Sequence, residues 1–228
     1  MLSVVILTDN SEEGLARTLA SLVSAAAEGV IREVVVVDDG SVDGTSKVAE
    51  AAGCLFLRGQ GTWGERIGHA IGAMRRAPWI LVLPPHVLLE GEWFRELSAF
   101  IERIERANRS EAIAATFRPA YDDFGTRARI AERTLSVCSG LFGLPVPEQG
   151  LVFSRRLWDR ARQTGGVPHF NSLVRRIGRR QIRMLRARAV VIARGPETSG
   201  IPSVAALTRH AFAALGLPVK ASGGRMGE

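Results

Sequence analysis

Cysteine, lysine and long apolar runs are all scarce in this chain of 228 residues. Its two cysteines, Cys54 and Cys138, belong to no CxxC motif and have no His-rich partner segment, so neither a disulfide framework nor a zinc site is predicted. The most apolar run, residues 79–89, is about half the ~20 residues of a membrane-spanning helix and contains two prolines. The sequence therefore predicts no transmembrane span.

The N-terminus also lacks the features of a signal peptide. MLSVVILTDN has no basic residue ahead of its short apolar stretch, a pattern that favours a strand. Together with the cysteine usage, this predicts a cytoplasmic protein. Peripheral association with the inner face of the membrane stays open at this point.

Basic residues are plentiful, but Lys47 and Lys220 are the only lysines among 30 basic residues, against 23 acidic ones. The formal net charge is +7. Arginine favours planar, bidentate partners such as phosphate or carboxylate, although a GC-rich genome enriches arginine equally. Disorder as the main state is excluded, because 46% of the residues are hydrophobic and only 23% are charged.

The positive charge gathers late in the chain, since residues 151–194 carry twelve arginines and a single acid, Asp159. Solvated helix and strand faces are one interpretation of the run from Arg175 to Arg188. The other is a surface for an anionic membrane or a lipid-phosphate acceptor. Nucleic acid is not an expected partner, because no aromatic residues interleave with these arginines.

The first half of the chain alternates short β-branched runs with amphipathic stretches. Strands are expected at 3–8, 33–38, 54–57 and 78–83, with helices between them. This order predicts an α/β fold of Rossmann type, with a mostly parallel sheet and helices on both faces. We expect one domain over residues 1–195, followed by a C-terminal helix and flexible tail over 196–228.

The segment EVVVVDDGSVDGT, residues 33–45, is the most informative for function. Asp38 and Asp39 stand at the end of the second strand, where open parallel sheets bind ligands. Carboxylates there can accept hydrogen bonds from a ribose hydroxyl or a base N–H. The alternative interpretation is that Asp39, Gly40 and Asp43 only form turns and cap a helix.

This segment closely resembles the nucleotide-binding signature of the family 2 glycosyltransferases, which have the GT-A fold. SVVILTDN and the following LARTLASL are similar to the opening strand and first helix of that family. The resemblance implies that Thr8, Asp9 and Asp39 contact the base and ribose of a nucleotide sugar, with Asp38 beside them. Asp9 stands where the family usually has an aromatic residue.

A second segment, WGERIGHAIGAMRRAPWILVLPPH, resembles the part of the family that runs from an arginine-containing helix into the metal-binding motif. The subgroup with an HAD-type motif is the most similar. Here Pro84, Pro85 and His86 occupy the place of the acidic motif. His86 is the metal candidate that remains, but Mn²⁺ and Mg²⁺ prefer hard oxygen ligands. We therefore expect weak or no metal dependence.

The third similar segment is EQGLVFSRRLWDRARQTGGVPHFNSLVRRIGRR, which resembles the acceptor side of the same subgroup. In the family a carboxylate pair in this segment supplies the presumed general base, yet no acid lies between Asp159 and Glu197. His169 and Glu148 are the remaining candidates for the catalytic base. A structural role is the alternative for each.

A competing motif, GQGTWG at residues 59–64, matches the dinucleotide-binding pattern GxGxxG. It follows the third strand rather than the first, and Trp63 would crowd a pyrophosphate, so NAD binding is not expected. Its glycines would instead let Arg66 approach the diphosphate of a nucleotide sugar.

Three functions therefore follow from the sequence. The first is glycosyl transfer from a nucleotide diphosphate sugar to an unknown acceptor. The second is a catalytically degenerate relative that acts as a non-enzymatic binding or scaffold protein. The third, a nicotinamide-dependent enzyme, depends on GQGTWG alone.

Overall fold

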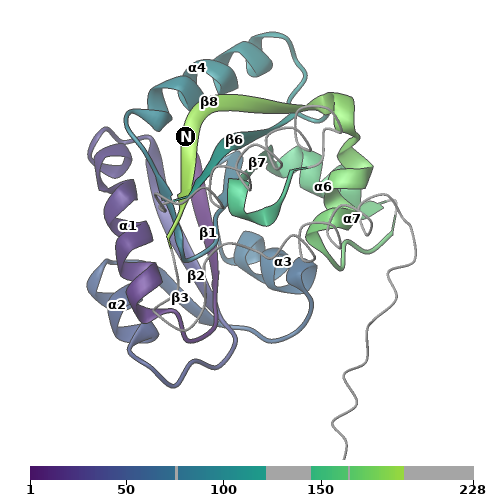
Figure 1. Ribbon diagram of the computed structural model, residues 1–228. Helices are drawn as coiled ribbons and strands as arrows, with labels where there is room; N and C mark the ends of the chain where they lie inside the picture. The colour runs from purple at the N-terminus through teal and green to yellow at the C-terminus, as the bar shows by residue number, and fades with distance from the viewer. Residues whose placement is uncertain (75–76, 122–144, 164, 193–228) are drawn as a thin grey trace, which may run out of the picture.

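The computed structural model describes residues 1–74, 77–121, 145–163 and 165–192. An eight-stranded sheet runs through its centre, with helices on both faces (Figure 1). The elements in chain order are β1 (Leu2–Thr8), α1 (Glu12–Ala27), β2 (Ile31–Asp38), α2 (Thr45–Ala51), β3 (Leu55–Arg58), α3 (Trp63–Ala73), β4 (Trp79–Val82), β5 (Val87–Leu89), α4 (Trp93–Arg106), β6 (Ala114–Tyr121), η1 (Pro147–Gln149), β7 (Leu151–Ser154), α6 (Arg155–Gln163), α7 (Phe170–Ile177), η2 (Arg179–Gln181) and β8 (Ile182–Val191).

The strand order is β3-β2-β1-β4-β7-β6-β8-β5. The first four strands of this order are mutually parallel, whereas β7 pairs antiparallel with both β4 and β6. Beyond them, β8 runs parallel to β6 and antiparallel to β5. The predicted α/β class with a mostly parallel sheet is therefore confirmed. The expected helix and tail over 196–228 lie outside the described residues.

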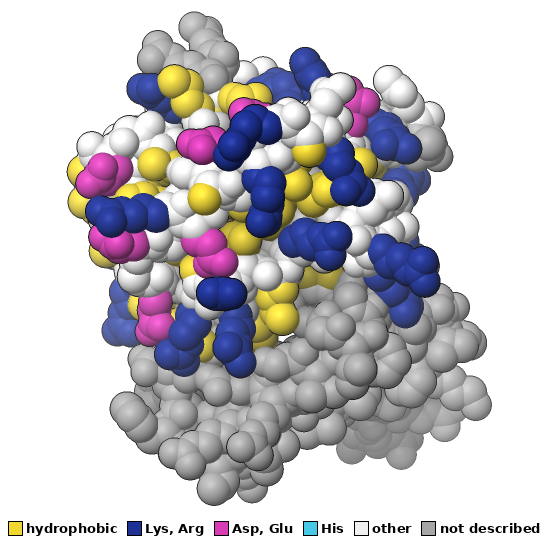
Figure 2. Space-filling view, turned by 90° about the horizontal axis from the view of Figure 1, so that it is seen from above, with side chains coloured by type: hydrophobic (Ala, Val, Ile, Leu, Met, Phe, Trp, Pro, Cys, Tyr) yellow, Lys and Arg dark blue, Asp and Glu magenta, His cyan; other side chains and the backbone are white. Residues whose placement is uncertain are grey.

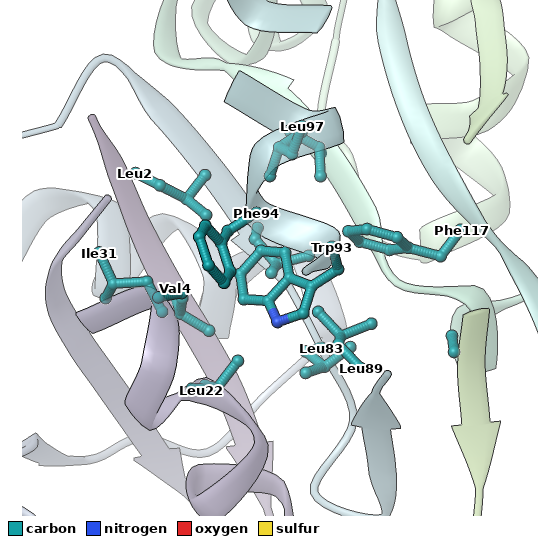
Figure 3. Packing of buried hydrophobic residues seen from close by; sticks show 14 of the residues in the cluster. Leu2, Val4, Leu22, Ile31, Leu83, Leu89, Trp93, Phe94, Leu97 and Phe117 are labelled. Carbon is teal, nitrogen blue, oxygen red and sulfur yellow. The ribbon is translucent and has the colours of Figure 1, made fainter. Parts of the chain in front are cut away.

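The middle strands β1, β4 and β7 are buried on both faces, as their largely apolar sequences predict. In β1, Val4 and Ile6 face α1 and α4, while Val5 faces α3 on the other side. Figure 3 shows the first of these two cores, where the Trp93 ring lies between Phe94 and Phe117. The sheet thus separates an α1, α2 and α4 layer from an α3, α6 and α7 layer.

One difference from the expected strands concerns the apolar run of residues 79–89. A single strand is predicted from 78 to 83, but the run forms both β4 and β5. Pro84 and Pro85 have no N–H groups with which to continue a ladder, so the chain leaves β4 before them. It re-enters the sheet at the far edge, where Val87 pairs with Val191 of β8.

Candidate functional site

The carboxyl ends of β1 and β2 form the part of the site that the sequence predicts best. Thr8 pairs with Asp38 at the last position of the two strands. The Asp38 side chain is 2% exposed and accepts hydrogen bonds from the Thr8 hydroxyl at 2.8 Å and from the Ser41 hydroxyl. Its second oxygen accepts the backbone N–H groups of Gly40 at 3.0 Å and Ser41 at 2.8 Å.

These contacts keep Asp38 ionised. Burial alone raises the pKa of a carboxyl, but the hydrogen bonds from Ser41, Thr8 and Gly40 outweigh it and lower the pKa of Asp38 below its ordinary value of 3.8. Both carboxylate oxygens of Asp38 accept hydrogen bonds, and the Thr8 hydroxyl donates to one of them. Asp38 and Thr8 therefore build the turn, and Asp39, the residue after Asp38, stands at the carboxyl edge of the sheet.

The loops after β1 and β2 are also joined to each other. Asn10 donates its N–H to the Ser41 hydroxyl at 2.8 Å and accepts the Val42 N–H at 3.0 Å. The Glu12 N–H donates to the Asp43 carboxylate at 3.1 Å, and the Glu12 carboxylate accepts the Gly44 N–H at 2.9 Å. The first turns of α1 and α2 therefore cap one another.

The cap of α1 comes from a distant loop. Ser11 occupies the N-cap position of α1, but its side chain makes no capping hydrogen bond. Asp43, from the loop after β2, takes that role. Asn10 adopts φ of 44°, a left-handed conformation that asparagine tolerates, and in this position it reaches the second loop.

Asp39 is the carboxylate of the DDG turn that stays accessible, with 36% of its side chain exposed. The Arg66 guanidinium lies 3.6 Å from it and is itself only 12% exposed. A terminal nitrogen of Arg66 also donates to the carbonyls of Thr8 at 2.9 Å and Val37 at 2.7 Å. One arginine from α3 therefore ties together the ends of β1 and β2 beside Asp39.

Asp9 follows Thr8 on an exposed loop, where it accepts a hydrogen bond from the Asn10 side-chain amide at 2.9 Å. Gln60, which the sequence does not mark as a site residue, is a further neighbour of the turn at Gly40. Its amide nitrogen lies 4.0 Å from where a Cβ of Gly40 would stand. The sequence signal for Gln60 is its position in the loop after β3, at the same edge of the sheet.

The residues after β4 do not suit a divalent cation. Pro84 and Pro85 offer no side-chain oxygen, and no group of three or more His, Cys, Asp or Glu side chains gathers anywhere in the described part of the chain. Mn²⁺ and Mg²⁺ bind through several oxygen ligands, so this donor set does not fit either ion.

His86 instead lines a cavity of about 560 Å³ beside the first turns of α1, together with Glu13 and Arg17. Its carbonyl accepts the Ile192 N–H at 3.0 Å. Gly14 permits this packing, because a Cβ there would stand 2.4 Å from the Pro85 carbonyl oxygen. His86 therefore lies in the α1 layer of the fold.

Glu148 sits in η1, directly before β7. Because β7 is antiparallel to β4 and Leu151 pairs with Val82, η1 lies at the carboxyl end of β4. Its neighbour Gln149 is fully buried and anchors the turn by donating to the Phe117 carbonyl at 3.2 Å. Glu148, half-buried, therefore belongs to the same sheet edge as Asp39.

His169 is the N-cap residue of α7, and its side chain makes no capping hydrogen bond. It follows Pro168, whose carbonyl accepts the Gly64 N–H of α3 at 3.3 Å. Since α3 begins at the carboxyl edge of the sheet, the exposed His169 is held on the α3 side of that edge. The sheet separates the α3 layer from the α1 layer that contains His86.

The GQGTWG segment has a structural explanation. Thr62 and Glu65 form a capping box, so the Glu65 N–H is bonded to the Thr62 hydroxyl and the Thr62 N–H to the Glu65 carboxylate. The Gly64 N–H is bonded to Pro168. The first turn of α3 thus uses these N–H groups internally, which argues against a dinucleotide phosphate there.

Comparison with known proteins agrees with this architecture. An uncharacterised glycosyltransferase of Mycoplasma pneumoniae is 30% identical over 112 residues, which are 46% of this chain and 38% of the relative. The match thus spans less than half of that protein. Among solved structures, glucosyl-3-phosphoglycerate synthase from Mycobacterium tuberculosis with Mn²⁺, UDP-glucose and phosphoglyceric acid has a TM-score of 0.61 at 15% identity, covering 96% of this chain and 81% of that one.

The same synthase with Mg²⁺ and UDP has a TM-score of 0.58 at 15% identity, again with 96% and 81% covered. At this identity the likeness shows the fold, and it confirms the GT-A type. The model of glycosyl transferase family 2 matches residues 3–180, well over half of the chain. The chain therefore belongs to glycosyl transferase family 2.

Proposed function

We propose that this protein binds a nucleotide diphosphate sugar at the carboxyl ends of β1 and β2 and transfers the sugar to an acceptor. The Arg66–Asp39 pair carries the proposal, because it presents an exposed carboxylate and a buried cation where such a ligand would lie. Asp39 accepts hydrogen bonds from the ribose or base, with Asp9 beside it. Membership of the family and the UDP-sugar complexes of the neighbours support this reading.

In the transfer step, the acceptor hydroxyl oxygen forms a bond to the anomeric carbon, and the bond from that carbon to the diphosphate breaks. A base must take the hydroxyl proton. Glu148 and His169 are the candidates, since η1 and the start of α7 both border the same edge. The nucleoside diphosphate leaves, and Arg66 is the nearby cation that favours its negative charge.

Metal dependence should be weak or absent in this protein, although the synthase from Mycobacterium tuberculosis was solved with Mn²⁺ or Mg²⁺. The donor set after β4 supports this view, since Pro84, Pro85 and His86 supply no carboxylate oxygen. The same feature supports the second candidate function, a binding or scaffold protein without turnover.

A nucleotide panel tests the proposal. UDP and GDP should be compared with NAD by thermal shift, each with Mn²⁺ and with chelator. A ligand at about 100 times its Kd stabilises the fold by about 2.7 kcal/mol. We expect a shift with a nucleoside diphosphate, little change on adding Mn²⁺, and loss of the shift in Asp39→Asn. A shift with NAD alone would contradict the proposal.

Turnover separates the enzyme from the scaffold protein. Release of nucleoside diphosphate from nucleotide sugars, followed with and without phosphoglyceric acid as a trial acceptor, should be lost in Asp39→Asn. Glu148→Gln and His169→Asn should each leave nucleotide binding intact. Whichever of the two replaces the catalytic base should abolish release of nucleoside diphosphate. Binding without release from any tested sugar would favour the scaffold function.

An anionic membrane surface is a further proposed partner. The basic strip, defined here as Arg179, Arg180, Arg183 and Arg186, is exposed, and its members form no ion pair with other described residues. Met184 within it is 44% exposed. Figure 2 shows the face with α4 and β8, where dark-blue side chains are spread among yellow and magenta ones.

This combination of charge and apolar surface suits anionic headgroups. Among the described residues, no helix has both the length and the apolar character that crossing a membrane requires.

A further inference from the structure

The connection between α6 and α7, which leads to His169, is held by hydrogen bonds from one arginine. From α7, a terminal nitrogen of Arg176 donates to the carbonyls of Ala161 and Gly165, and the other donates to the carbonyl of Gly166 at 2.7 Å. Three carbonyls from one short stretch of chain therefore converge on a single guanidinium.

These hydrogen bonds from Arg176 have a clear physical cause. Ala161 lies in the last turn of α6, whose terminal carbonyls lack partners within the helix and carry partial negative charge. The flat, forked guanidinium meets several carbonyls at once, which a lysine ammonium on its flexible stem cannot match. Gly165 has φ of 119°, and this left-handed turn directs its carbonyl and the next one to the same side chain.

The other side of the connection rests on α3. A Cβ on Gly64 would stand 1.5 Å from the Val167 carbonyl oxygen, so the two backbones are in direct contact. Next to them, the rings of Trp63 and Phe170 meet edge to face at 5.8 Å. The segment that ends at His169 is thus held between Arg176 and the start of α3.

We propose that Arg176 is a positioning residue for the acceptor side of the site. By fixing the connection against α3, it sets where His169 lies relative to the nucleotide edge, although Arg176 itself touches no substrate. The catalytic consequence of this inference rests on the proposed function, whereas the hydrogen bonds that hold the connection do not depend on it. It also assigns Arg176 a task separate from the basic strip.

The kinetic test compares Arg176→Lys with Arg175→Lys, a matched change at the exposed neighbouring position. Release of nucleoside diphosphate from the nucleotide sugar is measured as kcat and as KM for the donor. Misplacing a reacting group by about 1 Å costs up to roughly a hundredfold, so Arg176→Lys should lower kcat by roughly ten- to a hundredfold with donor KM nearly unchanged. Arg175→Lys should behave like the wild type.

Chemical rescue adds a readout that a general loss of folding would not give. Arg176→Ala should regain part of its kcat when guanidinium is added at low, non-denaturing concentration, because the free ion can occupy the vacated fork position. Methylammonium at the same concentration should rescue less, since it lacks the planar fork. Equal kcat in Arg176→Lys and the wild type would overturn the proposal.

A measurement without turnover keeps the two proposals apart. Hydrogen exchange of the Gly64 amide, which is bonded to Pro168, should be faster in Arg176→Ala and slower again with guanidinium. UDP stabilisation should be the same in the variant and the wild type. Unchanged Gly64 exchange would overturn the role of Arg176, whereas absence of UDP binding in the wild type would overturn the proposed function alone.

Discussion

The Arg66 guanidinium lies 3.6 Å from the Asp39 carboxylate while it donates to the carbonyls at the ends of two parallel strands. This pairing would join stability to the proposed nucleotide binding, because the same cation orders the backbone and orients the accessible acid. Substitutions of Arg66 should therefore affect both properties, whereas substitutions of Asp39 should affect binding alone.

Replacing Arg66 by Met leaves the carbonyl of Val37 without its charged donor. Hydrogen bonds to charged groups contribute about 1.5–3 kcal/mol, so we expect a loss of that order in the free energy of unfolding, together with a much smaller UDP-induced shift. Urea unfolding and thermal shift measure the two effects. The control is Asp39→Asn, which should keep the wild-type stability and lose the UDP shift. Strong UDP binding in Arg66→Met would contradict this coupling.

The lowered pKa of Asp38 predicts a specific pH dependence of stability. Because the folded state holds the ionised form, this contribution is fully present above the ordinary pKa of 3.8 and is lost as pH falls through the lowered value. Asp38→Asn should cost about 1–3 kcal/mol at pH 7, and its difference from the wild type should shrink below pH 3.8. Urea unfolding over a pH series measures this. A constant difference down to the lowest pH at which both proteins fold would refute it.

The sequence predicts this part of the molecule well because its signals are local. An unbroken apolar strand, two acids and a glycine turn all lie within residues 33–45. The cap of α1 could not be predicted in this way, since Asp43 reaches Glu12 across 31 positions. Capping propensity describes a residue and its next few neighbours, and it carries no information about a second loop.

Glu96 of α4 provides another contact over a long sequence separation. Its carboxylate accepts the N–H groups of Arg186, at 2.9 and 3.1 Å, and Ala187, at 2.8 Å, along the part of β8 that extends beyond its pairing with β5. An uncovered strand edge invites pairing with another chain. Glu96→Ala should therefore lower the free energy of unfolding by about 1–3 kcal/mol and increase self-association.

Light scattering and urea unfolding measure the two effects of Glu96→Ala. Glu96→Gln is the matched control, because its amide oxygen still accepts one of these N–H groups, and it should fall between the wild type and Glu96→Ala. A monomeric Glu96→Ala protein of unchanged stability would show that the carboxylate neither stabilises the fold nor protects the edge of β8 from self-association.

Binding of the basic strip to vesicles should depend on salt. Each surface arginine contributes about 1 kcal/mol of attraction to anionic lipid, screened over ~8 Å at physiological ionic strength. Co-sedimentation with phosphatidylserine vesicles should fall steeply as salt rises and should be nearly absent with phosphatidylcholine. The triple change of Arg179, Arg180 and Arg183 to Gln should weaken it and leave the UDP shift intact. Binding that persists at high salt would rule out this partner.

Beyond the carboxyl ends of β1 and β2, the sequence alone predicts the candidate site less completely. Glu148 reaches the edge through the antiparallel pairing of β7 with β4, a pairing that joins residues about 70 positions apart. Both interpretations of the arginine run, solvated faces or a surface for anionic lipid, leave its side chains outward, yet Arg176 donates to the backbone of its own layer. Charge patterns identify where arginines are, whereas the carbonyls that they meet depend on how α6 and α7 pack.

The mutual capping of α1 and α2 changes what a match to DGSVDGT means in any protein of this shape. Ser41, Asp43 and Gly44 lock two helix starts together, and this task would persist in a descendant that had lost every substrate. Such a descendant would keep the motif under selection for foldability alone. A match to this motif therefore identifies the junction between two βα units, and Asp39 with Arg66 is the pair to inspect when the chemistry is in question.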